Sequence, residues 1–190
     1  MSAAELNPLA CAAFLVVAFS VAGLAQAIWL SSPASSLLAW PLDCGATFRG
    51  RRLFGPNKTL RGFVVMIPAT SAAFALVRSL GPAGPWPLTV GQYAILGAVA
   101  GAGFMAAELP NSFIKRQLLI PAGAEATAPS LRQFFGVIDH LDSVCGALGA
   151  MALIVAVPVW TAVYVVAIGW LVHRGFSQLT FRLGGKARAA

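Results

Sequence analysis

Long apolar runs alternate with short charged segments along the whole chain. Residues 9–30 contain no Asp, Glu, Lys or Arg, and 22 such positions suffice for a helix to cross a hydrocarbon layer of roughly 30 Å. The pattern predicts an all-α integral membrane protein, a single domain over residues 1–190. Its five expected transmembrane helices lie at about 9–30, 62–80, 90–109, 134–157 and 159–176.

Two charged connections, residues 31–61 and 110–133, separate these runs, and we expect both to be loops. The segment Ser130-Leu-Arg-Gln133 has the spacing of a capping box, so a helix is expected to begin there. That helix is expected to run to Val157, because Pro158 lacks the backbone N–H that a continuing helix needs.

Small residues mark the expected contacts between helices. Gly97 and Gly101 lie four positions apart on the third apolar run, and Gly146 and Gly149 lie on the fourth. Glycine lets a neighbouring backbone come close inside a membrane, where packing drives helix association. We therefore expect these positions to face other helices.

The composition supports a membrane location. Hydrophobic residues make up 58% of the chain and charged residues 10%, whereas a soluble domain carries about 25% charged residues. Thirteen Lys and Arg against six acids give a net charge of +7. In a membrane protein this excess is better explained by cytoplasmic loops than by nucleic-acid binding, so no nucleic-acid partner is expected.

The cations are distributed unevenly over the expected bundle. Twelve of the 13 fall in the two charged loops and the C-terminal tail, and Arg78 alone falls on the other side. Because cytoplasmic segments carry an excess of Lys and Arg, we expect a multi-pass protein of the cell membrane with its N-terminus outside. The charged loops and the C-terminus are then cytoplasmic. The twelve are Arg49, Arg51, Arg52, Lys58, Arg61, Lys115, Arg116, Arg132, Arg174, Arg182, Lys186 and Arg188.

Four of the six carboxylates lie between residues 108 and 142, and three of them, Glu108, Asp139 and Asp142, lie beside sequence that suits lipid. Ionisable groups at such depth are costly and therefore point to a functional site. Asp139 and Asp142, three apart, share one face of a helix and could hold a divalent cation together. The alternative is that Asp139 and Asp142 lie at an interfacial helix end and form ion pairs with nearby arginines. Glu108 either completes the metal site or forms a salt bridge with an arginine.

Polar and cationic groups accompany these acids. Asn111, Ser112, Lys115 and Arg116 are of the kind that bind phosphate. The first charged loop has three glycines and ends in Lys58, Thr59 and Arg61, but it lacks the spacing of a P-loop. Its arginines could equally be solvated. A metal pair beside a basic cluster at a membrane face indicates nucleotide or phospholipid chemistry. Three apolar residues of the loop are expected to anchor it in the membrane interface: Phe48, Leu53 and Phe54.

Two sequence patterns resemble a known family. One is Ser112-x-x-Lys115-Arg116 followed by Asp139-x-x-Asp142; the other is Pro41-x-Asp43-x-Gly45 followed by Gly50-Arg-Arg52-x-x-Gly55-x-x-Lys58-Thr59-x-Arg61-Gly62. Together they resemble the membrane cytidylyltransferases that make CDP-lipids, and in particular their archaeal branch, the CDP-archaeol synthases. The longer bacterial pattern has other residues where Phe134-Phe135-Gly136 stands here, so the bacterial branch is the poorer match.

The resemblance implies a five-helix, Mg²⁺-dependent enzyme with a cytoplasmic active site. It would transfer a cytidylyl group from CTP to an isoprenoid glycerol-phosphate lipid, unsaturated archaetidic acid, and release pyrophosphate. Asp139 and Asp142 would hold Mg²⁺, and Asp43 would serve either a metal or the base. The implied triphosphate ligands are Lys58, Arg61, Lys115 and Arg116, with hydrogen bonds from Thr59, Asn111 and Ser112; the implied catalytic set is Lys115, Arg116, Asp139 and Asp142.

Two other functions stay open at this point. A CDP-alcohol phosphotransferase would consume a CDP-lipid, but it needs a second acidic pair, and none follows Asp142 here. A small transporter or scaffold for anionic lipids would bind without turnover. The sequence makes no prediction of oligomeric state.

Overall fold

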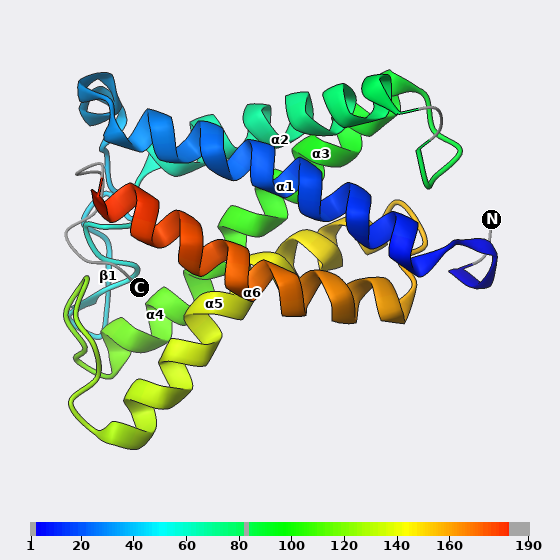
Figure 1. The fold of residues 1–190 in the computed structure, drawn as a ribbon. Helices are drawn as coiled ribbons and strands as arrows, with labels where there is room; N and C mark the ends of the chain where they lie inside the picture. Colours follow the sequence, from blue (N-terminus) through cyan, green and yellow to red (C-terminus); the bar gives the residue numbers. More distant parts are fainter. Residues whose placement is uncertain (1–2, 82–83, 183–190) are drawn as a thin grey trace.

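The computed structural model describes residues 3–81 and 84–182 and is mostly helical (Figure 1). The expected tail cations Lys186 and Arg188 lie outside the described residues. Two 3₁₀ helices, η1 (Ala3–Glu5) and η2 (Pro33–Leu38), and a hairpin of β1 (Thr47–Phe48) and β2 (Arg51–Arg52) accompany the α-helices. These are α1 (Pro8–Ser31), α2 (Leu60–Leu80), α3 (Val90–Ala106), α4 (Glu108–Gln117), α5 (Pro129–Ala152) and α6 (Val159–Arg182).

Four helical segments of the described chain are long and apolar enough to cross a membrane. They are Pro8–Ser31, Leu60–Leu80, Val90–Gln117 (α3 together with α4) and Pro129–Ala152. The apolar part of α6, Val159–Val172, is shorter. The expectation of an α-helical membrane protein is therefore confirmed at this level.

The expected loop 110–133 is wrong over its first part, because α4 occupies Glu108–Gln117. Pro110 lies in the first turn of this helix, where a backbone N–H has no partner within the helix, so proline is tolerated there. Lys115 and Arg116 lie in the last turn, where positive charge is favourable beside the unpaired carbonyls. The phosphate-binding candidates therefore sit on a rigid element.

The bounds of α5 also differ from expectation. The helix begins at Pro129 with Ala128 at its N-cap, and no described side chain caps it. The capping box expected at Ser130 is wrong, since Ser130 already lies inside the first turn. At the other end α5 stops at Ala152, before the expected Val157.

Glycines bring three helices into close contact, as expected. A Cβ on Gly97 of α3 would lie 2.5 Å from Thr70 O of α2, and a Cβ on Gly101 would lie 2.9 Å from Met66 O of α2. A Cβ on Gly146 of α5 would lie 2.5 Å from the carbonyl oxygen of Gly103 on α3. The expectation for Gly149 is wrong, because a Cβ there would meet no described atom within 4 Å. These contacts fix α3, and hence α4, against α5.

The contrast between two glycines of α5 gives a stability test. We expect Gly146→Val to lower the melting temperature in detergent by several degrees, because overpacking of a close contact costs typically ~1–3 kcal/mol. Gly149→Val makes the same chemical change in the same helix but faces open space, so we expect it to melt within a degree or two of the parent. Equal melting temperatures for both variants would contradict the close α3–α5 contact.

Candidate active site

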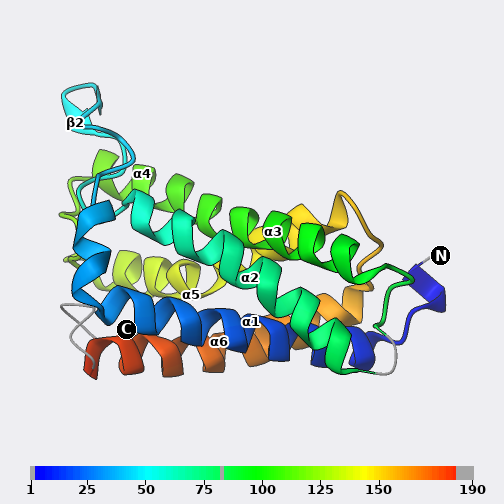
Figure 2. The ribbon, with the colours of Figure 1, turned by 90° about the horizontal axis from the view of Figure 1, so that it is seen from above.

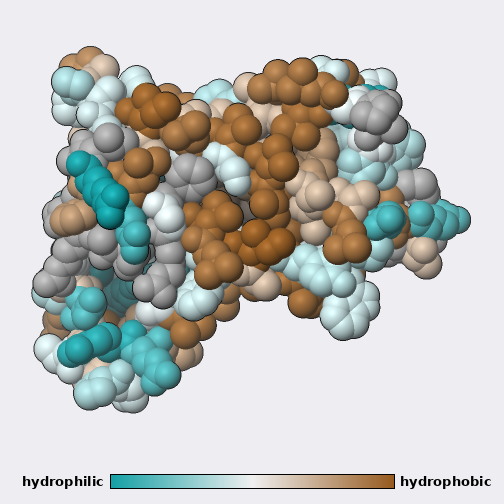
Figure 3. Space-filling view, viewed as in Figure 1, coloured by the Kyte–Doolittle hydropathy of each residue, from teal (hydrophilic) through white to brown (hydrophobic). Residues whose placement is uncertain are grey.

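Polar and apolar side chains meet in one large cavity. Its volume is about 1090 Å³, and it is lined by residues of all six α-helices and of the segments before α2 and α5. Val16, Phe19 and Val165 are among its apolar lining residues. On the molecular surface a hydrophobic band crosses the helices and hydrophilic residues gather at both ends (Figure 3). Nine polar residues of the cavity lie towards the end that carries α4: Lys58, Thr59, Arg61, Glu108, Ser112, Lys115, Arg116, Asp139 and Asp142.

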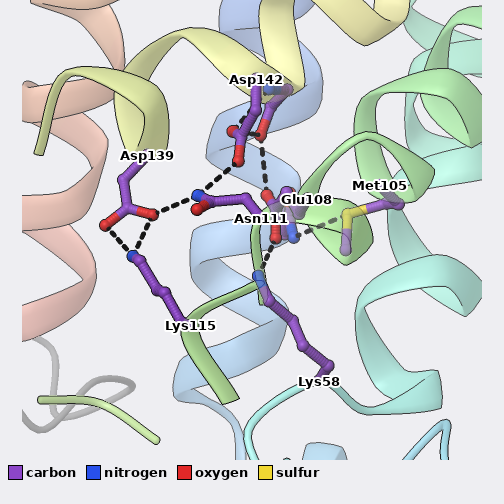
Figure 4. Close-up of polar contacts among 9 residues, drawn as sticks. Lys58, Met105, Glu108, Asn111, Lys115, Asp139 and Asp142 are labelled. Atoms are coloured by element: carbon purple, nitrogen blue, oxygen red, sulfur yellow. Dashed lines mark hydrogen bonds and ion pairs between the residues drawn. The ribbon is translucent and has the colours of Figure 1, made fainter. Parts of the chain in front are cut away.

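Asn111 joins the two aspartates of α5. Its Nδ2 donates to Asp139 Oδ1 at 2.6 Å and to Asp142 Oδ2 at 3.1 Å (Figure 4). The residue is buried, and its Oδ1 has no hydrogen-bond partner among the described residues. Both carboxylates lie on one face of α5, as the three-residue spacing predicted, and that face is turned towards Asn111 of α4.

Two lysines neutralise the neighbouring carboxylates. Lys115 of α4 forms an ion pair with Asp139, and its ammonium lies 5.3 Å from the centre of the Phe135 ring. Lys58, just before α2, forms an ion pair with Glu108 of α4 (Figure 4). Glu108 therefore pairs with a lysine instead of the arginine that the sequence left open. These four charges thus each have a partner of opposite sign, which is the condition for burying them.

The environment of Lys58 keeps its ammonium charged. Burial would lower the pKa of Lys58, but the charge and hydrogen bond of Glu108 outweigh this, helped by the charges of Asp142 and Asp139. The net effect raises the pKa above its ordinary value. A charged Lys58 is what binding of a phosphate oxygen requires.

Arg116 reaches the cavity beside a glycine loop. Its Nε is buried without a hydrogen-bond partner in the described part of the chain, so a donor is left for an anion. A Cβ on Gly55 would lie 3.3 Å from Arg116 Nη1, and Gly55 has φ of 90°, which side chains other than glycine rarely adopt. Glycine at position 55 thus allows the positive φ of the turn and leaves room for the Arg116 guanidinium.

Asp43 has a different place from that expected. Its side chain is fully buried, pairs with Arg52, and accepts hydrogen bonds from the backbone N–H groups of Gly45, Phe54 and Gly55 at 3.1, 3.1 and 2.9 Å. It is not among the residues lining the cavity. Its carboxylate holds the base of the hairpin, so the expectation that it serves a metal or the base finds no support in this geometry.

The chemistry of Asp139 and Asp142 fits a Mg²⁺ site, whereas Glu108 has other partners. In the described ranges no three His, Cys, Asp or Glu side chains gather as a metal site, and Glu108 is taken by Lys58 and by Ser143 Oγ at 2.8 Å. Mg²⁺ is usually bound by one or two carboxylates plus substrate phosphates and waters. Asp139 and Asp142, whose carboxylates both accept a hydrogen bond from Asn111 Nδ2, fit that requirement.

Two residues at the site were missed from the sequence. Ser143 Oγ donates a hydrogen bond to Glu108. Because Ser143 directly follows the candidate metal ligand Asp142, the sequence could have marked it as a residue of the site. Gln26 lines the cavity from α1, and its Nε2 lies 3.9 Å from Met105 Sδ, a weak contact. It is the only side-chain amide between residues 8 and 31, and a strongly polar group in such an apolar helix is itself a sign of function.

Comparison with known proteins identifies relatives over most of the chain. Residues 34–188 match the family model described as CarS-like, CDP-archaeol synthase. The CDP-archaeol synthase of Halobacterium salinarum is 35% identical over 145 residues, covering 70% of this chain and 74% of that protein. The enzyme of Methanopyrus kandleri is 33% identical over 140 residues, covering 70% and 72%. A solved structure of an intramembrane enzyme for archaeal membrane lipids biosynthesis has a TM-score of 0.56 at 28% identity, covering 83% of this chain and 91% of its own.

The Asp43–Arg52 pair gives a pH-dependent stability. Burial alone would raise the pKa of Asp43, but hydrogen bonds from Arg52 and three backbone N–H groups outweigh it and hold the pKa well below its ordinary value of 3.8. A carboxyl whose pKa is depressed on folding stabilises the protein above that ordinary value and loses this contribution as the pH falls below it. We expect Asp43→Asn to melt several degrees lower at neutral pH, with the difference narrowing below pH 3.8.

The matched control is the exposed pair Glu125–Arg132, whose side chains are 66% and 55% accessible. Exposed ion pairs contribute about 0–1 kcal/mol, so Glu125→Gln should change the melting temperature little at any pH. A constant difference between wild type and Asp43→Asn across the acid range would contradict the depressed pKa of Asp43.

Proposed function

The chain belongs to the CDP-archaeol synthase family, and on that premise we propose that its cavity is the active site for CTP-dependent cytidylyl transfer to unsaturated archaetidic acid. The lipid phosphate attacks the α-phosphorus of CTP, and pyrophosphate leaves. The observation that supports this most is that one cavity joins Asp139, Asp142 and four cations to an apolar chamber. Nucleotide and lipid can then meet without either leaving its preferred surroundings.

The chemistry needs charge neutralisation and alignment more than a covalent nucleophile. The phosphoryl oxygens carry several negative charges, and transfer proceeds with the attacking and leaving oxygens roughly in line. Lys58, Arg61, Lys115 and Arg116 bind the triphosphate, and Thr59 and Ser112 donate hydrogen bonds to it. No general base is needed, because the attacking phosphate is already an anion.

Substrate binding exchanges ion pairs instead of creating charges. Lys58 and Lys115 leave the carboxylates that hold them and pair with phosphate oxygens, so each ammonium stays neutralised throughout. Asp139 and Asp142 would hold Mg²⁺, which would supply electrophilic neutralisation of the phosphates. Asn111 holds the two carboxylates together, and Ser143 holds Glu108 when Lys58 departs.

The apolar part of the cavity takes the isoprenoid chains. Its walls come from α1, α3, α5 and α6, which keeps hydrocarbon out of water. Gln26 lies where the apolar wall meets the charged end, next to Met105. Its amide is placed to hydrogen-bond an oxygen of the phosphoglycerol backbone of the lipid.

The charged end of the bundle faces the cytoplasm. Residues 49–61, Lys115, Arg116 and Arg132 put eight cations at this end, and an excess of Lys and Arg is typical of cytoplasmic segments. α1, α2, α3, α5 and α6 are then the five spans, and α4 lies at headgroup depth. The N-terminus is outside, and CTP reaches the site from the cytoplasm.

Turnover is the direct test of the reaction. Purified protein with radiolabelled CTP, Mg²⁺ and unsaturated archaetidic acid should form CDP-archaeol and pyrophosphate, and EDTA should stop the reaction. Release of CMP from supplied CDP-archaeol and an alcohol would instead identify a phosphotransferase, and binding without product would identify a transporter or scaffold. Asp142→Asn should lower the rate by about 100-fold or more, because it removes a ligand for the neutralising cation.

The control is Glu5→Gln, which removes a carboxylate at the opposite end of the bundle and should leave the rate unchanged. Both variants should elute and melt like wild type, so that a lost rate reflects chemistry. Near-normal turnover of Asp142→Asn would remove this residue from the metal site.

Native cysteines report on orientation. Cys44 is exposed beside the hairpin and Cys11 is buried; Cys145 is also exposed, so the test uses a Cys145→Ala protein. In intact cells, a membrane-impermeant maleimide should leave Cys44 unlabelled, and permeabilisation should expose it; Cys44→Ser should lose the signal. Labelling of Cys44 from outside intact cells would reverse the proposed orientation.

A further inference from the structure

The β1–β2 hairpin stands away from the bundle. All residues from Cys44 to Arg51 are exposed, and Arg49 and Gly50 at its tip have φ of 53° and 74°. Figure 2 shows the hairpin projecting beyond α4, across the direction of the helix axes. Because spanning helices run along the membrane normal, such a projection at the charged end of the bundle extends over neighbouring lipid headgroups.

α4 is amphipathic in the sense opposite to a surface helix of a soluble protein. Asn111 and Ser112 are buried, whereas Ile114 of α4 and Leu118 at its C-cap are 48% and 50% exposed. Leu119, two residues beyond the last residue of the helix, is 70% exposed. A helix of a soluble protein turns its apolar face to the core. An outward apolar face fits the boundary between headgroups and hydrocarbon.

The hairpin adds an aromatic ring and cations to this face. Phe48 is 45% exposed; its ring lies 5.8 Å from that of Phe113 on α4 and carries the Arg49 guanidinium 5.2 Å above it. Arg51 donates a hydrogen bond to Gln117 O at the end of α4. Residues 44–54 contain three arginines and no acid; Arg52 is matched by Asp43, whereas Arg49 and Arg51 are exposed.

We propose that these residues form an interfacial docking surface for anionic lipid headgroups of the cytoplasmic leaflet. This α4–hairpin surface consists of Phe48, Arg49, Arg51, Ile114, Leu118 and Leu119. The arginines pair with lipid phosphates, and the apolar side chains enter the hydrocarbon just below the headgroups. This arrangement is the one expected at a membrane interface. The inference rests on the proposed orientation. Docking holds the loop that carries Lys58 at the depth where an acceptor phosphate lies.

The native Cys44 provides the probe. A Cys145→Ala protein, labelled on Cys44 with a fluorophore, is placed in nanodiscs of phosphatidylcholine alone or mixed with an equal amount of phosphatidylglycerol. We expect quenching by lipids brominated near the headgroup to be about twofold stronger with phosphatidylglycerol, and the excess to disappear at high salt. Arg49→Asn should abolish the excess, because Asn tolerates the positive φ but lacks the charge. The matched control Arg182→Gln removes a cation at the end of α6 and should keep it.

Equal quenching in both lipids, or an excess that survives Arg49→Asn, would overturn the docking surface. Quenching that depends on protein concentration would mean that a second copy of the chain binds this surface, and would also overturn the proposal of lipid docking. Product formation from CTP is recorded in the same nanodiscs. A normal rate without headgroup-dependent quenching overturns the docking surface alone, and docking without product overturns the proposed reaction alone.

Discussion

Charges at membrane depth need partners, and this constraint organises the structure. An isolated ion in a medium of low polarity costs several kcal/mol, roughly, even after relaxation of its surroundings. The chain meets the cost with two lysine–carboxylate pairs, Lys58–Glu108 and Lys115–Asp139, and with the amide of Asn111 between Asp139 and Asp142. In the proposed reaction the same groups bind the triphosphate and a divalent cation, so stability and the proposed function share one network.

The helices bring this network together from distant parts of the sequence. Lys58 precedes α2, Glu108 and Asn111 lie on α4, and the aspartates lie on α5. The close contact of Gly103 with Gly146 holds α3 against α5 and thereby fixes where α4 begins. α4 can then turn polar groups to the cavity and apolar groups outward. That reversed amphipathicity follows from having the polar interior and the lipid on opposite sides of one short helix.

Much of the fold can be predicted from the local sequence pattern, whereas the side chains that pair with one another within the site cannot. Apolar runs predicted the long helices, and the spacing of Asp139 and Asp142 predicted their shared face. The existence of α4 was missed because Pro110 and the charges around it are as typical of a loop as of a first helical turn. The role of Asp43 depends on a turn built by Cys44, Gly45 and Gly55 with positive φ, which no periodicity reveals. Pairing of Lys58 with Glu108 spans 50 positions and needs the tertiary structure.

The exchange of lysine partners is tested most directly by a crystal structure with a non-hydrolysable CTP analogue and Mn²⁺, whose anomalous signal marks the metal. We expect the signal beside both Asp139 and Asp142, with Lys115 Nζ moved from Asp139 to a phosphate oxygen. A metal bound away from these two carboxylates, or a nucleotide in the cavity while Lys115 stays on Asp139, would contradict the exchange.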